Sequence, residues 1–349
     1  MQHILKGALA VSAFALTLGM AQAQDLAPLN SDSEPDRIVW SELEAKFGAL
    51  PAPPAGTKVG GVSKTLTNEY WRSLGEGYQN VATALGIEFV YQAAQNEGDQ
   101  LGQLSIAENL ISQGFNALLF SPQSDANLIP AVEAATAAGI PVLNVNDAVI
   151  PSATHYVGNQ QKGNGVNVAN WFIANRPDGG KVAVIEGQPG VYAAGQRTAG
   201  FTETINANGK FEVVASVPAN WSREEAFNAA ATILQQHPDL IGFYANNDGM
   251  ALGVVEAVKA AGLQDKVAVF GTDGVSDAYA AVRSGDLTGT VDSFPVLTGE
   301  IAMEVVLRLL AGQDLPRVVE TPQALITKDN VETYATTDMA ALRAALMAN

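Results

Sequence analysis

Hydrophobic and polar positions alternate regularly along the chain from residue 58 onward. Short apolar runs rich in β-branched residues end at turn-forming residues, and a longer stretch with apolar residues at helical spacing follows each run. The runs predict eight strands, over residues 58–63, 88–93, 117–122, 141–146, 181–187, 211–218, 240–247 and 267–274. Repeated strand–helix units form parallel sheets covered by helices on both faces, so we predict an α/β fold.

Eight strand–helix units can close into one barrel or divide between two open sheets. The chain changes character at residues 155–165, after four units, and 349 residues are enough for two domains. The pattern therefore favours two lobes, each with its own parallel sheet.

The first 23 residues have the features of a signal peptide. Lys6 supplies a positive charge, an apolar run follows over residues 7–20, and Ala21-Gln22-Ala23 has the form that signal peptidase cleaves. We expect a mature chain that begins near Gln24. Because the sequence has no cysteine to carry a lipid anchor, we expect it to be free in the periplasm.

Residues 24–56 differ from the rest and are interpreted as an N-terminal extension and a Pro-rich linker. Ile38, Val39, Leu43 and Phe47 have helical spacing, which predicts a short helix over residues 36–48. The Pro-rich stretch that follows predicts a break between this helix and the first lobe.

Composition narrows the possible functions. The chain has 19 Lys and Arg against 36 Asp and Glu, a formal net charge of −17, which disfavours binding to nucleic acid or to anionic membranes. The absence of cysteine excludes thiol nucleophiles, Fe–S clusters and the usual structural zinc sites, and we expect no cofactor. Nucleophile-elbow and phosphate-loop motifs are absent, although carboxylates such as Asp248 and Asp273 leave a glycosidase possible.

Polar and aromatic side chains follow the carboxyl ends of most predicted strands. Ligands of open parallel sheets bind at these ends, so the candidates are Asn68, Tyr70, Trp71, Gln123, Asn146, Asp147, Arg197, Trp221, Asn247 and Asp273. Simpler interpretations exist, since the first two aromatic residues fit a helical core stripe and each aspartate fits a cap or turn. For Trp221, a ligand platform and loop packing are equally compatible with its polar surroundings.

Four segments resemble the ribose-binding branch of the periplasmic sugar-binding proteins. They are LTNEYW at 66–71, QRTAGF at 196–201, ANNDGMALG at 245–253 and FGTDG at 270–274, and the resemblance extends over residues 58–334. It implies two Rossmann-like lobes joined by three crossing strands, near residues 155–158, 293–295 and 321–324. The N-terminal lobe would comprise residues 57–156 and 295–322. The C-terminal lobe, with the tail, would comprise residues 157–294 and 323–349.

The resemblance also implies a function. Such proteins close on a sugar like a hinge and deliver it to an ABC permease, and some also serve a chemoreceptor. We expect a monomer whose ligand contacts are Asn68, Tyr70, Trp71, Arg197, Trp221, Asn247 and Asp273, with aromatic walls for the sugar's C–H faces and polar groups for its hydroxyls.

Two departures from the ribose-type pattern affect the expected ligand. Asn146-Asp147 stands in place of Asp-Arg, and Ser293 stands in place of Gln, so we expect a sugar other than ribose. Site carboxylates outnumber the one cation, Arg197, which favours a neutral monosaccharide or an acyclic polyol. We also expect substitution of Asp147 to abolish binding without changing the stability of the empty protein.

Two other functions remain open from the sequence. One is a sensory subunit that binds a furanosyl signal, and the other is an exported glycoside-processing enzyme. A sugar-responsive repressor is set aside because a signal peptide stands where a DNA-binding headpiece would lie.

Overall fold

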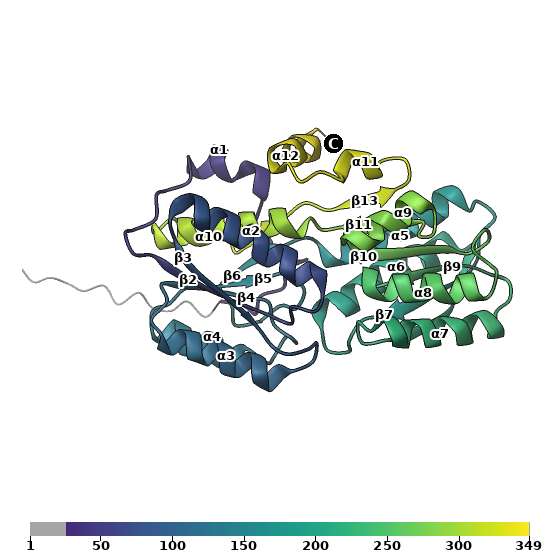
Figure 1. The fold of residues 1–349 in the computed structure, drawn as a ribbon, viewed down its shortest axis with the longest axis horizontal. Helices are drawn as coiled ribbons and strands as arrows, with labels where there is room; N and C mark the ends of the chain where they lie inside the picture. The colour runs from purple at the N-terminus through teal and green to yellow at the C-terminus, as the bar shows by residue number, and fades with distance from the viewer. Residues whose placement is uncertain (1–25, 349) are drawn as a thin grey trace, which may run out of the picture.

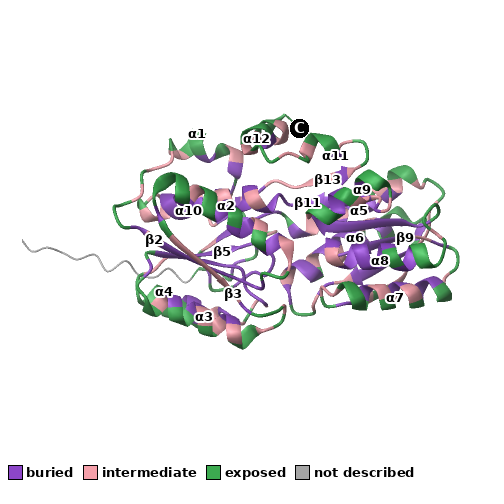
Figure 2. Cartoon of the chain, in the orientation of Figure 1, coloured by how far each residue is buried: buried purple, intermediate pink, exposed green. Residues whose placement is uncertain are grey.

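Two α/β lobes lie side by side in the computed structural model, which describes residues 26–348 (Figure 1). The predicted signal peptide falls outside the described residues. In each lobe the central strands and the inward faces of the helices are buried (Figure 2). Within residues 26–348 we find no helix with the length and apolar character needed to cross a bilayer.

The N-terminal lobe contains a sheet of seven parallel strands. Their spatial order is β1 (Arg37–Val39), β12 (Val318–Glu320), β6 (His155–Gly158), β5 (Val142–Val145), β4 (Ala117–Phe120), β2 (Lys58–Ser63) and β3 (Glu88–Ala93). Helices α2 (Glu69–Leu85) and α10 (Pro295–Leu310) cover one face, and α3 (Gln100–Ser112) and α4 (Ile129–Ala137) cover the other (Figure 1).

The C-terminal lobe contains a sheet of six strands. Their order is β13 (Ala324–Thr327), β11 (Gly289–Asp292), β10 (Ala268–Asp273), β9 (Leu240–Ala245), β7 (Gly180–Glu186) and β8 (Phe211–Pro218), and only β13 runs antiparallel to its neighbour. Helices α5 (Gln161–Asn175) and α6 (Tyr192–Asn208) pack together on one face. On the other face α7 (Arg223–Gln236) and α8 (Asp248–Ala260) pack together, and the right-handed connection from β10 to β11 places α9 (Ser276–Ser284) on that same face.

Most predicted elements are confirmed. The strands predicted at 58–63, 88–93 and 211–218 have those bounds, and the other five agree to within two residues at each end. The chain crosses between the lobes three times, from β6 to α5, from β11 to α10 and from β12 to β13. The expected α/β fold of two lobes with a hinge of three crossings is therefore present.

The first crossing lies slightly later than predicted. Val157 and Gly158, which we assigned to the C-terminal lobe, pair with β5 and β12 as part of β6 in the N-terminal lobe. The crossing begins only where this pairing ends.

The N-terminal segment is part of the first lobe, which corrects our interpretation of an extension set apart by a linker. Residues 37–39 form β1 rather than helix, and only a short 3-10 turn, η1 (Trp40–Glu42), and α1 (Leu43–Phe47) follow. Pairing of β1 with β12 decides the local conformation, and Ile38, Trp40 and Leu43 are buried in the core.

The C-terminal tail divides between the lobes. β13 and α11 (Val331–Tyr334) belong to the second lobe, whereas α12 (Met339–Met347) returns to the first (Figure 1). Arg343 of α12 contacts Glu300 and Glu304 of α10 at 3.1 and 2.9 Å, and its guanidinium lies 5.4 Å from the centroid of the Trp40 ring. Only part of residues 323–349 therefore lies with the C-terminal lobe to which we assigned the whole range.

Candidate functional site

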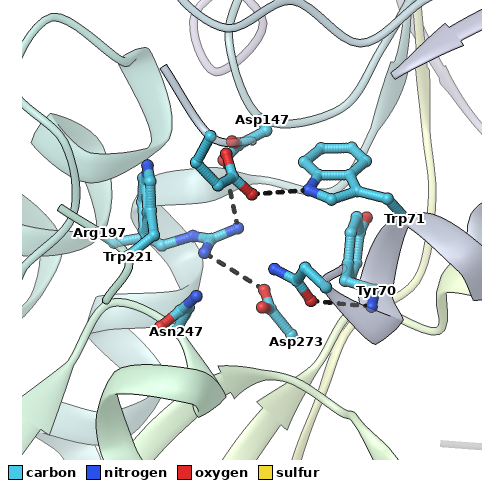
Figure 3. Close-up of a pocket in the computed structure, with 9 residues that line it drawn as sticks. Tyr70, Trp71, Asp147, Arg197, Trp221, Asn247 and Asp273 are labelled. Atoms are coloured by element: carbon cyan, nitrogen blue, oxygen red, sulfur yellow. Dashed lines mark hydrogen bonds and ion pairs between the residues drawn. The ribbon is translucent and has the colours of Figure 1, made fainter. Parts of the chain in front are cut away.

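A small cavity lies between the two lobes, at the carboxyl ends of both sheets (Figure 3). Both lobes contribute to its lining, which consists of Asn68, Tyr70, Trp71, Glu97, Asp147, Arg197, Trp221, Asn247 and Asp273. Eight of our eleven predicted site residues are therefore brought together around one cavity.

Aromatic rings from opposite lobes form two walls of the cavity. Tyr70 and Trp71, at the start of α2, pack edge to face with centroids 4.8 Å apart, and Trp221 faces them from the loop before α7 (Figure 3). Gly187 makes room for the Trp221 ring, because a Cβ atom there would lie 2.0 Å from it. Such walls can pack against the C–H faces of a flat, hydroxylated ligand.

Arg197 extends from α6 into the space between the walls (Figure 3). It donates to Gln161 Oε1 at 2.9 Å and to the Asn246 carbonyl at 2.7 Å, and it lies 3.4 Å from Asp273 and 3.8 Å from Asp147. Burial alone would lower the pKa of Arg197, but the two carboxylates outweigh that effect and raise it. The guanidinium is thus held charged and in a fixed orientation.

Close helix packing fixes the position of Arg197. A Cβ atom at Gly165 of α5 would lie 2.1 Å from the Arg197 carbonyl oxygen, and one at Gly200 of α6 would lie 2.1 Å from the Lys162 carbonyl oxygen. The two glycines allow α5 and α6 to approach at the level of the arginine.

Asp273 ends β10 at the cavity. Burial raises the pKa of this carboxyl group well above its ordinary range, and Arg197 opposes the shift only in part. Asp273 lines the cavity and pairs with Arg197 at 3.4 Å, so its oxygens can accept from the guanidinium and from a ligand hydroxyl.

Lys64 is a second buried cation that our sequence analysis missed. It directly follows β2, its ammonium group pairs with Asp147, and it lies 5.6 Å from the ring centroids of both Trp71 and Trp221. Our premise that Arg197 is the only cation of the site was therefore wrong. The rule that identified the other candidates applies equally to Lys64, but a lysine in a loop is usually exposed.

Glu97 is the second residue that we missed, and it lies in the loop after β3. Its Oε1 accepts from Trp71 Nε1 at 3.0 Å, while Oε2 is buried without a hydrogen-bond partner in the described chain. Burial raises the pKa of Glu97, against an opposing effect of Lys64. Its free oxygen is therefore a candidate partner for a ligand hydroxyl.

Two asparagines combine a helix cap with a place in the cavity lining. Asn68 Oδ1 accepts from Tyr70 N at 3.0 Å at the start of α2, and Asn247 Oδ1 accepts from Met250 N at 2.9 Å at the start of α8. The Asn68 side chain also lies close enough to Glu97 to lower the pKa of that carboxyl group, whereas the Asn247 amide is left as a group for a ligand. The carboxylate of the next residue, Asp248, accepts from Gly274 N and Val275 N and holds the end of β10.

Three predicted site residues lie behind the cavity rather than on it. Gln123 donates to the Lys64 and Asn96 carbonyls and accepts from Gly98 N, so it holds the loops that carry Lys64 and Glu97. Asn146 contacts the Tyr70 hydroxyl with its amide group and accepts from Gln161 at 2.6 Å. Ser293 is fully buried at the second lobe crossing. As placed, these three support the site from behind.

The cavity and the hinge also contain the unusual backbone conformations. Among residues 26–348, the non-glycine residues with positive φ are Asn146, Asp147, Asn220, Trp221, Asp273 and Phe294. Four lie in loops near the cavity, Asp273 is the last residue of β10, and Phe294 lies at the second crossing. Residues in such conformations tend to cluster at ligand sites and hinges.

No cluster of three or more His, Asp or Glu side chains in the described chain is arranged to bind a metal ion.

A model of the periplasmic binding protein domain matches residues 59–314. The chain belongs to the periplasmic binding protein family. A D-ribose/D-allose-binding protein of Pseudomonas aeruginosa is 33% identical over 300 residues, which are 82% of this chain and 92% of that protein. A xylitol-binding protein of Mycolicibacterium smegmatis is 30% identical over 83% of this chain and 88% of its own length.

Solved structures agree with this assignment. A periplasmic solute-binding protein of an ABC transporter from Actinobacillus succinogenes, solved with bound D-allose, superposes with a TM-score of 0.76 at 31% identity and covers 80% of this chain and 100% of that one. This periplasmic binding protein is a solute-binding protein and not an enzyme, so the glycoside-processing alternative falls away.

Proposed function

We propose that this binding protein captures a neutral monosaccharide or polyol in the interlobe cavity, in the periplasm, and delivers it as a monomer to an ABC permease. The observation that carries the proposal is a small cavity with aromatic walls from both lobes and charged groups that are paired with one another. Closure of the lobes around the ligand would create the surface that a permease recognises.

The charge pairing favours a neutral ligand. Lys64 pairs with Asp147, and Arg197 lies within ion-pair distance of Asp273 and Asp147, so neither cation is left without a counter-charge. A phosphorylated or carboxylated ligand would have to separate these pairs and would face Glu97 as well. Hydroxyl groups can instead share the existing donors and acceptors, at about 1.5–3 kcal/mol for each charge-assisted hydrogen bond.

The ligands named for the relatives, ribose, allose and xylitol, are all neutral compounds that carry several hydroxyl groups. Among them we propose that ribose binds at least about 10-fold more weakly than the cognate ligand. Asp147 offers an acceptor where the ribose-type pattern has a guanidinium, so hydroxyls at that edge must donate rather than accept.

A thermal-shift screen tests the proposal. Purified protein is heated with allose, ribose, xylitol, other pentoses, hexoses and polyols, and with sugar phosphates as the charged comparison. A cognate ligand at 100 times its dissociation constant should stabilise the protein by about 2.7 kcal/mol. The proposal fails if no neutral compound raises the melting temperature, or if a sugar phosphate raises it most.

A further inference from the structure

Three helices of the C-terminal lobe begin without a capping side chain of their own. The N-cap residues of α5, α6 and α9 are Gln160, Val191 and Val275, and none of them provides a side-chain hydrogen bond to its helix in the described structure. By contrast, α7 and α8 of the same lobe are capped by Ser222 and Asn247. The first N–H groups of a helix need a partner and favour a negative one.

A carboxylate from the N-terminal lobe occupies each of these three helix starts. Asp32 accepts from Gln161 N and Lys162 N of α5, both at 3.0 Å. Asp125 accepts from Tyr192 N of α6 at 3.1 Å. Glu69 binds Ser276 of α9 with both oxygens, accepting from its amide at 2.9 Å and from its hydroxyl at 2.8 Å.

These carboxylates are set around the cavity but are not part of its lining. Asp32 lies in the N-terminal segment beside the first crossing, Asp125 lies in the loop before α4, and Glu69 is the first residue of α2. Because α6 and α9 pack on opposite faces of the C-terminal sheet, Asp125 and Glu69 join the lobes at two separate places.

We propose that Glu69 and Asp125 are affinity-determining residues that hold the lobes closed across the cleft. Glu69 does so by capping α9, and Asp125 by capping α6. The inference rests on the proposed function and adds to it a determinant of affinity that does not touch the ligand. Opening the hinge separates each carboxylate from its helix, and the helix start then has no capping side chain. The closed state is therefore favoured by contacts that the open state lacks.

The proposal makes a specific kinetic statement. A ligand enters the open form and leaves only after the lobes open, so losing a contact between the lobes accelerates release and leaves association nearly unchanged. Since neither carboxylate lines the cavity, every ligand should be weakened by the same factor. A residue that contacts the ligand would instead change the ratio between two ligands.

Ser276→Pro is the cleanest variant, because it removes both groups that bind Glu69 and keeps the helix. Proline is favoured at the first helical position, and Val275 has φ −72° and ψ 157°, which suits a residue before proline. Glu69→Ala removes the other partner. Glu76→Ala, at an exposed position of the same helix α2, is the matched control.

Stopped-flow release of two sugars that the wild-type protein binds should be about 10-fold faster in Ser276→Pro and in Glu69→Ala, by the same factor for both sugars. The double variant should be no faster than either single variant to within about twofold, and Glu76→Ala should match the wild type. Unchanged release rates in both single variants, or a changed ratio between the two sugars, would overturn the proposal.

A second measurement needs no ligand. Spin labels on the two lobes report the interlobe distance in the empty protein, and both single variants should shift it toward longer distances than Glu76→Ala does. If the wild-type protein binds no sugar, the proposed function fails, while this distance still decides whether Glu69 holds the lobes together. An unchanged distance distribution in both variants would refute the closure role.

Discussion

Trp221 has a costly conformation for a large aromatic residue. Its φ is 65° and that of Asn220 is 51°, and the indole N–H has no partner within the described chain. Each such residue costs about 1–3 kcal/mol, which ordinary loop packing does not explain. The ring's place opposite Trp71 gives a reason for it.

Replacing Trp221 by alanine should therefore weaken ligand binding by about 1–3 kcal/mol without lowering the melting temperature of the empty protein. Trp171 offers the contrast, because it packs against Phe172 and Phe270 away from the cavity. Trp171→Ala should lower the melting temperature and leave affinity unchanged. If Trp221→Ala bound the ligand as tightly as the wild type, as measured by calorimetry, Trp221 would be a loop anchor only.

The Lys64–Asp147 pair changes our expectation for Asp147. From the sequence we expected Asp147→Ala to abolish binding at unchanged stability, but the substitution would leave the buried ammonium of Lys64 without its nearest counter-charge. Breaking such a pair costs about 3–5 kcal/mol. Asp147→Ala should therefore lower the melting temperature as well as affinity, and Lys64→Met in addition should restore much of the stability. An unchanged melting temperature in Asp147→Ala would show that the pair contributes little.

Individual side chains set the limit of what the sequence could predict about the site. Asn68, Arg197 and Asp273 follow strands or begin helices within recognisable motifs, so their places at the cavity could be expected. Lys64 and Glu97 follow strands in the same way, but both residue types are usually solvated, and only their burial reveals a role. Asn146 and Ser293 lie near the cavity, but their side chains belong to the layer behind it. A position after a strand does not by itself distinguish a residue of the lining from one of this supporting layer.

The strands outside the repeated strand–helix units were the elements that the sequence predicted least well. β1, β12 and β13 have three or four residues each and owe their extended conformation to pairing with distant strands. Around β1 the apolar residues also fit a helical spacing, so the local pattern gave the wrong element. Longer strands with flanking helices, such as β2 and β8, were predicted to the residue.

The place of β1 in the lobe makes Trp40 a test of the N-terminal segment. Trp40 is buried against the first lobe and under Arg343, so Trp40→Ala should reduce the free energy of unfolding by about 3–5 kcal/mol. Glu44→Ala, at an exposed position of α1, should have little effect. Chemical denaturation of both variants gives the comparison. If the free energy of unfolding of Trp40→Ala equalled that of the wild type, the segment would be an extension that does not stabilise the lobe.

The end of β11 gives the protein a pH-dependent stability. Burial raises the pKa of Asp292 to about 8, although its carboxylate accepts from Tyr279 at 2.7 Å and from Phe294 N at 2.6 Å. A carboxyl group with a pKa raised by folding stabilises the protein fully below the unfolded value, near 4, and loses this contribution as the pH rises toward 8. For one such group the loss is at most about 1.4 kcal/mol per pH unit.

Urea unfolding of the ligand-free protein should therefore show lower stability at pH 8 than at pH 5. Asp292→Asn should reduce the loss of stability between pH 5 and pH 8, whereas Asp329→Asn, at an exposed position, should leave it as in the wild type. The assignment would be wrong if Asp292→Asn kept the full pH dependence. In that case Asp248, whose pKa burial raises to about 6, would be the next group to substitute.

The molecule as a whole combines a two-lobe frame with a small polar cavity. Each sheet directs its carboxyl ends toward the other lobe, and only from that arrangement do Trp221 and Trp71, 150 positions apart in the chain, become opposite walls. The repeated strand–helix pattern was enough to predict this frame. Which charges pair across the cavity depends on how the lobes close, and no pattern in the sequence contains that information.

Calorimetric titration of the purified protein tests the central claim most directly. Neutral monosaccharides and polyols are compared with their phosphorylated counterparts under one buffer condition. We predict that at least one neutral compound binds with one site per chain and a dissociation constant near or below the micromolar range, about 8 kcal/mol, and that its phosphate ester binds far more weakly. Tighter binding of the phosphate ester, or no binding by any neutral sugar or polyol, would contradict the account.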